Sequence, residues 1–154
     1  MIKIETARGD LLAVATGHIV HGCNAQGVMG GGVAKAVKEK YPIVFQEYRE
    51  LYKNEQLRVG EADFYLVDTK LVIWNAITQE FYGRSGRNCS YDAIQTCFAQ
   101  INTAIPTFPD IPQEVHIPMI GAGLGGGNWE IIKTIIEQTM DYPTTLWIPL
   151  LQSQ

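Results

Sequence analysis

The sequence contains little cysteine and no excess of positive charge. Its 154 residues include three cysteines, an odd number that argues against a disulfide framework. Twelve lysines and arginines are outnumbered by sixteen aspartates and glutamates, which gives a formal net charge of −4. An extended nucleic-acid-binding surface usually needs a basic excess, so we expect none here. A nucleotide held in a pocket is still compatible with this charge, because backbone amides bind phosphates without any lysine.

Long apolar runs are absent as well. No segment reaches the ~18 residues of a membrane span. The first ten residues, MIKIETARGD, lack the basic start and apolar stretch of a signal peptide. These absences predict a cytoplasmic protein without a membrane partner. With 46% hydrophobic residues, the chain suits one domain, residues 1–154, that buries a core without disulfides or metals.

Strand and helix patterns alternate along the chain. We expect strands at 2–6, 18–24, 64–68, 71–77, 114–120 and 144–150, and helices at 33–41, 42–54, 90–104 and 129–140. Pro42 suits the first position of a helix, and Ser90 and Asn128 suit the residue that caps one. This order predicts an α/β fold with a mostly parallel sheet and helices on both faces.

Two glycine-rich segments are the main functional signal. The first holds Gly27 and Gly30 to Gly32, and the second is GAGLGGG at 121–127. Each follows an expected strand and precedes an expected helix, where glycine lets backbone N–H groups approach a ligand and the helix dipole favours an anion. Ligands of open α/β sheets bind beyond the carboxyl ends of the strands. We therefore predict that the two segments grip a diphosphate, although tight turns alone would also need glycine.

Other nucleotide sites fit less well. Gly121, Gly123 and Gly126 match G-x-G-x-x-G, but a dinucleotide fingerprint should open the first βαβ unit and be followed by an acidic residue on the next strand. Here the pattern precedes the last helix, and Asp141 falls in a turn. The P-loop pattern G-x-x-x-x-G-K-[ST] is missing from the sequence. A nicotinamide or P-loop site is therefore disfavoured.

Polar residues near the first glycine segment leave alternatives open. Asn24 ends an expected buried strand. One interpretation is that its amide contacts a sugar hydroxyl or positions a water. The other is that it forms hydrogen bonds within its own turn. His18, His21 and Cys23 are close in sequence, but His18 and His21 point to opposite faces of a strand. Buried structural roles are favoured over a zinc site, and we expect no metal.

Three ordered motifs resemble those of the macrodomain family across nearly the whole chain. They are Gly9-Asp10-Leu11, HGCNAQGVMGGGVAKAV at 21–37 and IPMIGAGLGGGNW at 117–129. The resemblance implies a three-layer α/β/α sandwich with a central mixed, mostly parallel sheet, and ADP-ribose or ADP-ribose 1″-phosphate as the ligand. ADP-ribosylated macromolecules are further possible partners. No metal or organic cofactor is implied.

The resemblance also assigns ligand-binding residues. Asp10, with Gly9 and Leu11, would hold the adenine through its amino group. The distal ribose and its 1″ substituent would lie against Asn24, Met29, Gly30, Gly31, Gly32 and Val33. The diphosphate would be wrapped by Ile120, Gly121, Ala122, Gly123, Leu124, Gly125 and Gly126.

The motifs look closest to the branch that holds terminal ADP-ribose glycohydrolases and DNA-linked ADP-ribose antitoxins, with two departures. Gln79 stands where that branch has a catalytic lysine, and Gly125 where some members have an aspartate. Lysine-type deglycosylation is therefore not expected, because an amide cannot act as the amine or the cation.

What remains resembles the small phosphatases that remove phosphate from ADP-ribose 1″-phosphate. Asn24 and His21 are then the candidate catalytic residues, Asn24 to orient the ribose or a water and His21 as an acid or base. Met29 replaces a histidine that often precedes the glycine triplet in related branches. The alternatives are a hydrolase that removes ADP-ribose from protein or nucleic acid, and a non-catalytic ADP-ribose reader.

Overall fold

A computed structural model describes residues 1–82, 88–122 and 125–150. Six strands form one sheet: β1 (Glu5–Arg8), β2 (Gly17–Asn24), β3 (Ala62–Asp68), β4 (Leu71–Gln79), β5 (Val115–Ile117) and β6 (Thr144–Ile148). The spatial order is β1-β6-β5-β2-β4-β3, and the edge strand β3 alone runs antiparallel to its neighbour. This is the mixed, mostly parallel sheet that the sequence predicts.

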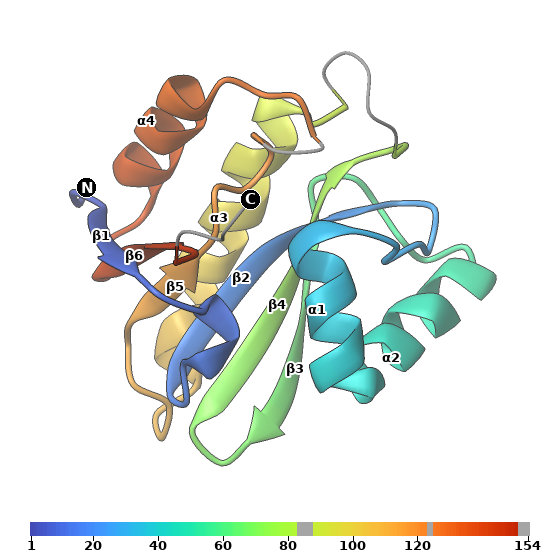
Figure 1. The fold of residues 1–154 in the computed structure, drawn as a ribbon, viewed down its shortest axis with the longest axis horizontal. Helices are drawn as coiled ribbons and strands as arrows, with labels where there is room; N and C mark the ends of the chain where they lie inside the picture. Colours follow the sequence, from blue (N-terminus) through green and yellow to red (C-terminus); the bar gives the residue numbers. More distant parts are fainter. Residues whose placement is uncertain (83–87, 123–124, 151–154) are drawn as a thin grey trace.

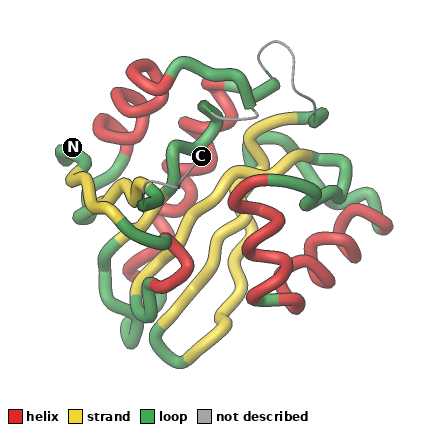
Figure 2. The backbone as a smooth tube through the Cα atoms, in the orientation of Figure 1, coloured by secondary structure: helices red, strands yellow, loops and turns green. Residues whose placement is uncertain are grey.

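Helices cover both faces of the sheet and give three layers (Figure 1). On one face lie α1 (Gly32–Lys40) and α2 (Pro42–Lys53), and on the other α3 (Tyr91–Ala104) and α4 (Trp129–Thr139). Short 3₁₀ turns, η1 (Leu11–Ala13) and η2 (Ile105–Thr107), complete the described elements. The strands run between the two pairs of helices in the tube view (Figure 2). The α/β/α sandwich is confirmed.

The alternation of side chains along the central strands builds the two cores. From β4, Trp74 and Ala76 point toward α3 and α4, whereas Ile73 and Ile77 point toward α1 and α2. Both faces of β2 and β4 are therefore buried, which explains why they appear in sequence as almost continuous apolar runs.

Three helix starts follow the sequence signals. Pro42 occupies the first turn of α2, where its missing N–H costs no hydrogen bond. The Ser90 hydroxyl accepts from the Ala93 N–H at the start of α3. The Asn128 side chain accepts from the N–H groups of Glu130 and Ile131 at the start of α4. These predictions are confirmed.

Several strand boundaries differ from the sequence prediction by one to three residues, and two of the differences have a clear cause. β1 begins at Glu5, because the N–H groups of Ile2 and Ile4 bond the backbone and side-chain oxygens of Glu137 on α4 instead of a strand. The strand expected at 114–120 is shortened to β5, which ends at Ile117, because Pro118 has no N–H to continue a ladder. The apolar pattern continues past Ile117 without strand geometry.

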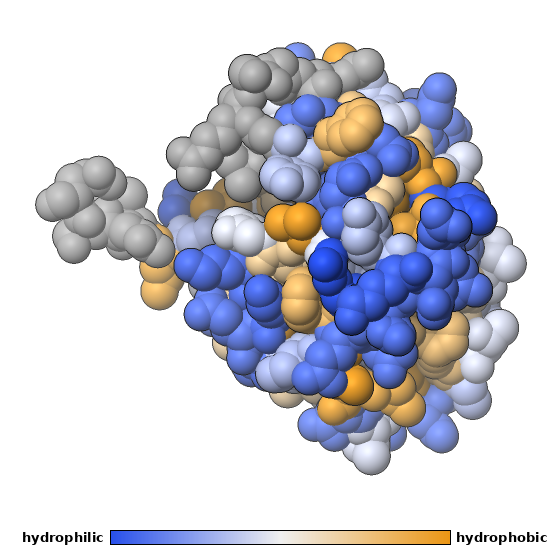
Figure 3. Space-filling view, turned by 90° about the vertical axis from the view of Figure 1, so that its right-hand side faces the viewer, coloured by the Kyte–Doolittle hydropathy of each residue, from blue (hydrophilic) through white to orange (hydrophobic). Residues whose placement is uncertain are grey.

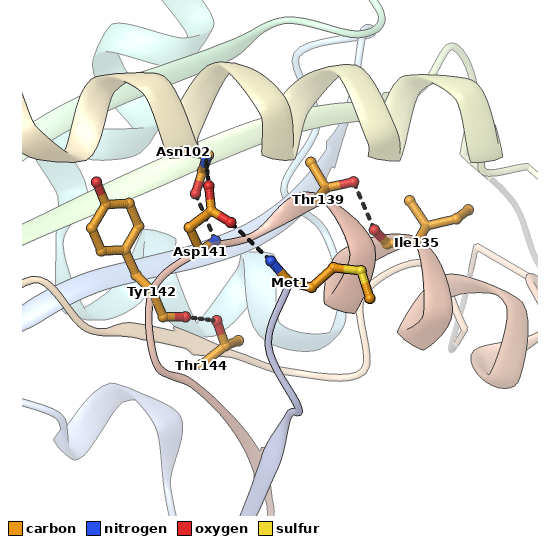
Figure 4. Close-up of polar contacts among 7 residues, drawn as sticks. All are labelled: Met1, Asn102, Ile135, Thr139, Asp141, Tyr142 and Thr144. Carbon is orange, nitrogen blue, oxygen red and sulfur yellow. Dashed lines mark hydrogen bonds and ion pairs between the residues drawn. The ribbon is translucent and has the colours of Figure 1, made fainter.

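The N-terminus is tied to the connection between α4 and β6 (Figure 4). The Met1 ammonium group donates to Asp141 Oδ1 at 2.8 Å, and the Asn102 amide on α3 donates to Asp141 Oδ2 at 3.0 Å. These hydrogen bonds, first from the ammonium group and then from Asn102, hold the pKa of Asp141 below its usual range. Asp141 therefore anchors the chain end in this structure.

None of the helices in the described ranges combines the length and apolarity that a membrane crossing needs.

Candidate functional site

The predicted site residues come together at one edge of the sheet. Asp10 follows β1, Asn24 ends β2, Gln79 ends β4, and the second glycine segment follows β5. These strands are parallel, so their carboxyl ends meet on the same side of the molecule, which we call the carboxyl edge (Figure 1). Within it, Asn24 pairs with Gln79 in the β2–β4 register. This is where open α/β sheets bind ligands.

The Asn24 side chain organises the first glycine loop, residues 25–31. Its Oδ1 accepts from the N–H of Gln26 at 2.9 Å and of Val28 at 3.4 Å, and its Nδ2 donates to the Val28 carbonyl at 2.9 Å. The side chain is 8% exposed. Of the two roles left open by the sequence, hydrogen bonding to its own turn is the one that the structure displays directly.

Tyr48 on α2 forms a hydrogen bond with Asn24 on the buried side of the loop. Its fully buried hydroxyl lies 2.6 Å from the Asn24 backbone carbonyl and 2.9 Å from Asn24 Oδ1. Burial raises the pKa of Tyr48 well above its usual range, so the hydroxyl keeps its proton and donates. The sequence pattern places Tyr48 only in the apolar stripe of its helix, and no local signal connects it to Asn24, which lies 24 residues earlier.

Backbone N–H groups of the first loop and of the start of α1 lack an acceptor among the described residues. Within the described ranges, none of the N–H groups from Met29 to Ala34 donates to a protein atom. The first N–H groups of any helix are free in this sense, but α1 also lacks a side-chain cap at Gly31, unlike α3 and α4. The segment is therefore suited to an anion that the protein itself does not supply.

The glycines of the two segments differ in what requires them. A Cβ on Gly30 would meet only Val28 Cγ1, at an ordinary 3.5 Å, and one on Gly32, whose φ is +58°, would meet nothing within 4 Å. A Cβ on Gly125 would lie 2.7 Å from the Gly121 carbonyl oxygen, and one on Gly127 would lie 2.6 Å from Cys89 Sγ. Internal packing demands glycine in the second segment, whereas Gly30 faces open space.

The second segment closes on itself. The Gly127 N–H donates to the Gly121 carbonyl at 2.7 Å, and the N–H groups of Asn88 and Cys89 donate to the Gly125 carbonyl. Ile120 is buried beneath this turn, and Ala122 packs against the core. The predicted contacts of Gly123 and Leu124 lie outside the described residues.

The predicted adenine end lies beside β6. The Gly9 N–H bonds the Ile148 carbonyl, and glycine is necessary there because φ is +148° and a Cβ would lie 3.2 Å from the Trp147 ring. Asp10 is exposed, and its Oδ1 accepts from the Leu12 N–H at 2.9 Å as the cap of η1. Leu11 is buried beneath it. The cap occupies one carboxylate oxygen of Asp10.

His21 lies in the core between the sheet and α2. It is fully buried, and its Nε2 is 2.6 Å from Asn75 Oδ1. Burial lowers its pKa to about 4, against a smaller raising effect of the Asn75 hydrogen bond. A solvent-borne substrate does not reach this ring in the structure, so its position favours the structural role over the acid–base role.

The neighbouring His18 and Cys23 do not join His21 in a metal site. His18 faces the opposite side of the sheet, where its Nδ1 accepts from Trp74 Nε1 at 3.0 Å. The Cys23 thiol is buried, and burial is the first of the effects that raise its pKa well above the usual value. Among the residues that the structure describes, no group of three or more His, Cys, Asp or Glu side chains is placed to hold a metal ion.

Gln79 sits next to Asn24 at the end of β4, as its motif position implies. Its Nε2 donates to the Phe81 carbonyl at 2.6 Å, which turns the side chain toward its own connection. The chemistry of an amide is therefore all that this position offers at the carboxyl edge.

Proteins similar to this chain include one without a named activity and others with two different named activities. A protein of Enterobacteria phage T4, described as an uncharacterized 17.5 kDa protein, is 30% identical over 96% of this chain and 99% of its own length. A DNA ADP-ribosyl glycohydrolase of Mycobacterium tuberculosis is 27% identical over 95% of this chain, which spans only 42% of that protein. An ADP-ribose 1″-phosphate phosphatase of Lodderomyces elongisporus is 26% identical over 89% of this chain and 92% of its own length.

Solved structures agree on the fold. A protein of unknown function from Bacteroides thetaiotaomicron superposes with a TM-score of 0.86 at 28% identity and covers 97% of this chain and 99% of its own. The Thermosipho africanus protein DarTG in complex with ADP-ribose gives a TM-score of 0.78 at 18% identity over 97% of this chain and 43% of its own. The Macro domain model matches residues 20–136, from β2 into α4. The match extends over most of the chain, and the protein belongs to the Macro domain family.

Proposed function

We propose that this protein binds ADP-ribose at its carboxyl edge and hydrolyses ADP-ribose 1″-phosphate. The observation that carries the proposal is the run of backbone N–H groups from Met29 to Ala34, which has no acceptor in the described ranges. An uncapped helix start preceded by further free amides matches a doubly charged phosphate better than a neutral group. The family membership and the phosphatase relative support ADP-ribose 1″-phosphate as the ligand.

Each part of the ligand has a proposed place. Asp10 accepts from the adenine amino group through the carboxylate oxygen that does not cap η1. The second segment wraps the diphosphate. Its described residues at this place are Ile120, Gly121, Ala122, Gly125 and Gly126. Gly30, Gly31 and Gly32, with Val33 after them, face the distal ribose and its 1″-phosphate. The side chain of Met29 is buried in the core, so Met29 offers the ligand only its backbone N–H.

The proposed reaction needs little covalent participation from the protein. A water oxygen attacks phosphorus, the bond between phosphorus and the 1″ oxygen breaks, and a proton ends on that oxygen, leaving ADP-ribose and inorganic phosphate. The free N–H groups would stabilise the charge on the phosphoryl oxygens in the transition state. Asn24 keeps a second amide hydrogen that its bond to Val28 does not use, and it would orient the ribose or the attacking water.

Gln79 favours the phosphatase over the glycohydrolase. It stands where the resembling branch has its lysine, and the amide has neither its nucleophile nor its charge.

Removal of ADP-ribose from a modified macromolecule is the second candidate. The M. tuberculosis protein of that name matches 95% of this chain, which supports this alternative. A reader that binds without turnover is the remaining alternative.

One assay separates these functions. The purified protein is incubated with ADP-ribose 1″-phosphate and, in parallel, with ADP-ribosylated DNA and protein, and released phosphate and ADP-ribose are measured. We expect phosphate from the first substrate only, and no phosphate from Gly30→Val, which controls for a contaminating phosphatase. Release of ADP-ribose alone would establish the second candidate, and binding without any product would establish the reader.

A further inference from the structure

A cavity of about 330 Å³ lies behind the first glycine loop, on the side of α1 and α2. It shares Met29 and Gly30 with the carboxyl edge and differs from it in being lined by Lys38, Phe45 and Arg49 of the two helices. Its lining residues are Gly27, Val28, Met29, Gly30, Lys38, Phe45 and Arg49. The face of the molecule over α1 and α2 is largely hydrophilic, with hydrophobic side chains scattered between the polar ones (Figure 3).

Two cations from successive helices converge on this cavity. Lys38 Nζ lies 4.2 Å from the centroid of the Phe45 ring, and Arg49 Cζ lies 5.1 Å from that of Tyr52. Within the described ranges, neither cation forms an ion pair with a carboxylate. Aromatic faces hold the two side chains without neutralising them, so the cavity keeps its positive charge although the whole chain carries −4.

Residues of the cavity contact the first loop through a hydrogen bond and through close packing. Arg49 Nη1 donates to the Gly27 carbonyl at 3.4 Å, and a Cβ on Gly27 would lie only 2.7 Å from Tyr52 Cγ and 2.9 Å from Arg49 Nη1. Gly27 also has a φ of +73°. The loop backbone is thus packed against α2, and Gly27, Val28, Met29 and Gly30 form one side of the cavity.

We propose that this cavity is a second anion site that binds a phosphate group between Lys38, Arg49 and the loop. A planar guanidinium and an ammonium together match the several acceptor oxygens of a phosphate better than a single carboxylate. The site does not depend on phosphatase activity. Because it shares the Gly27–Gly30 wall with the carboxyl edge, its occupancy restrains the loop and tightens ligand binding there, and the effect is reciprocal.

Inorganic phosphate is the probe for the test. It is titrated at constant ionic strength into the isotope-labelled protein, and the backbone amide signals of Gly27, Met29 and Gly30 are followed by NMR. We expect Lys38→Met, which keeps an apolar stem against Phe45, to weaken phosphate binding roughly fivefold to thirtyfold, as the loss of one charge-assisted contact implies. Lys133→Met on α4 removes the same charge from the opposite layer and should change nothing.

A second titration in saturating ADP-ribose locates the phosphate. If phosphate still binds with the same dependence on Lys38, and ADP-ribose binds more tightly in phosphate, the second site stands. Displacement of phosphate by ADP-ribose would place it at the carboxyl edge instead and overturn the proposal. Equal weakening by Lys38→Met and Lys133→Met would reduce the effect to net charge and overturn it too. If ADP-ribose does not bind at all, the proposed function fails, while the first titration still decides this site.

Discussion

The Asn24 side chain shapes the first glycine loop and has one donor left for a ligand or a water. The carbonyl oxygen and one amide hydrogen hold the loop in shape, and only the second amide hydrogen is left for a ligand or a water. Replacing Asn24 would therefore change the loop geometry together with any catalytic contact. A sharper experiment acts on the residue behind it.

Tyr48→Phe removes only the hydroxyl that donates to Asn24. We expect this variant to lose about 1–3 kcal/mol of stability, because a buried carbonyl loses its donor. If the hydroxyl also positions Asn24, turnover should fall more than affinity for ADP-ribose 1″-phosphate. Denaturant unfolding and steady-state kinetics measure the two effects. Tyr52→Phe, on the same helix but 37% exposed, is the matched control and should leave both unchanged.

Asp10 is predicted to read the adenine amino group. Asp10→Ala should weaken ADP-ribose binding by about 1–3 kcal/mol, measured by calorimetry. The loss of the η1 cap also contributes to this number. Hypoxanthine in place of adenine separates the two effects, because it has a carbonyl where adenine has the amino group. Wild-type protein should prefer the adenine ligand, and the Asp10→Ala variant should not; an unchanged preference would remove Asp10 from the adenine site.

At the scale of elements, the two glycine segments have different physical requirements. The second segment is glycine-rich because its backbone folds onto Gly121 and Cys89, whereas the first is open at Gly30. The sequence shows both segments as glycine clusters after a strand, and only the packing around each Cβ position separates a turn requirement from an open surface.

A pair of substitutions tests this difference. Gly30→Val should leave the unfolding free energy within about 0.5 kcal/mol of wild type, since φ is not positive there and space is open. It should abolish ADP-ribose binding by covering the free amides. Gly127→Ala should instead destabilise the fold by roughly 1–3 kcal/mol, because its Cβ meets Cys89 Sγ at 2.6 Å. Calorimetry and denaturant unfolding of both variants supply the comparison, and normal ADP-ribose binding by Gly30→Val would contradict the proposed site.

Across the whole molecule, the two buried histidines predict how stability changes with pH. Burial lowers the pKa of both His18 and His21 from 6.5 to about 4, with His116 adding to the effect at His18 and Asn75 opposing it at His21. Between pH 6.5 and about 4, these histidines are therefore protonated in the unfolded chain but neutral in the native state. The stabilising contribution is complete above pH 6.5 and is lost progressively as the pH falls from there to about 4.

His21 alone should account for up to roughly 3 kcal/mol of this acid-sensitive stability. Denaturant unfolding between pH 7 and pH 4 measures it in the wild type and in His21→Gln, whose amide keeps a hydrogen-bonding group beside Asn75 without titrating. The variant should show a shallower loss toward acid. Identical pH profiles would mean that His21 titrates normally. Enzymatic activity retained by the same variant at neutral pH would also place the ring outside the catalytic machinery.

Much of the fold could be predicted from local chemistry. The helix starts at Pro42, Ser90 and Asn128 follow from a missing N–H and from side-chain acceptors, which act within three residues. The strand limits at Glu5 and Ile117 were predicted less well, because Glu137 on α4 captures the first amides and Pro118 ends a ladder that hydrophobicity alone would continue.

Local sequence patterns were enough to predict the α/β class, the two glycine segments and Asn24 at the end of a strand, because each depends on neighbours along the chain. What these residues contact depends on the packed fold. It buried His21 against Asn75, placed the Tyr48 hydroxyl under Asn24, and set Lys38 and Arg49 around one cavity. Such contacts join residues far apart in sequence, and they are fixed only when helices and sheet pack into one arrangement.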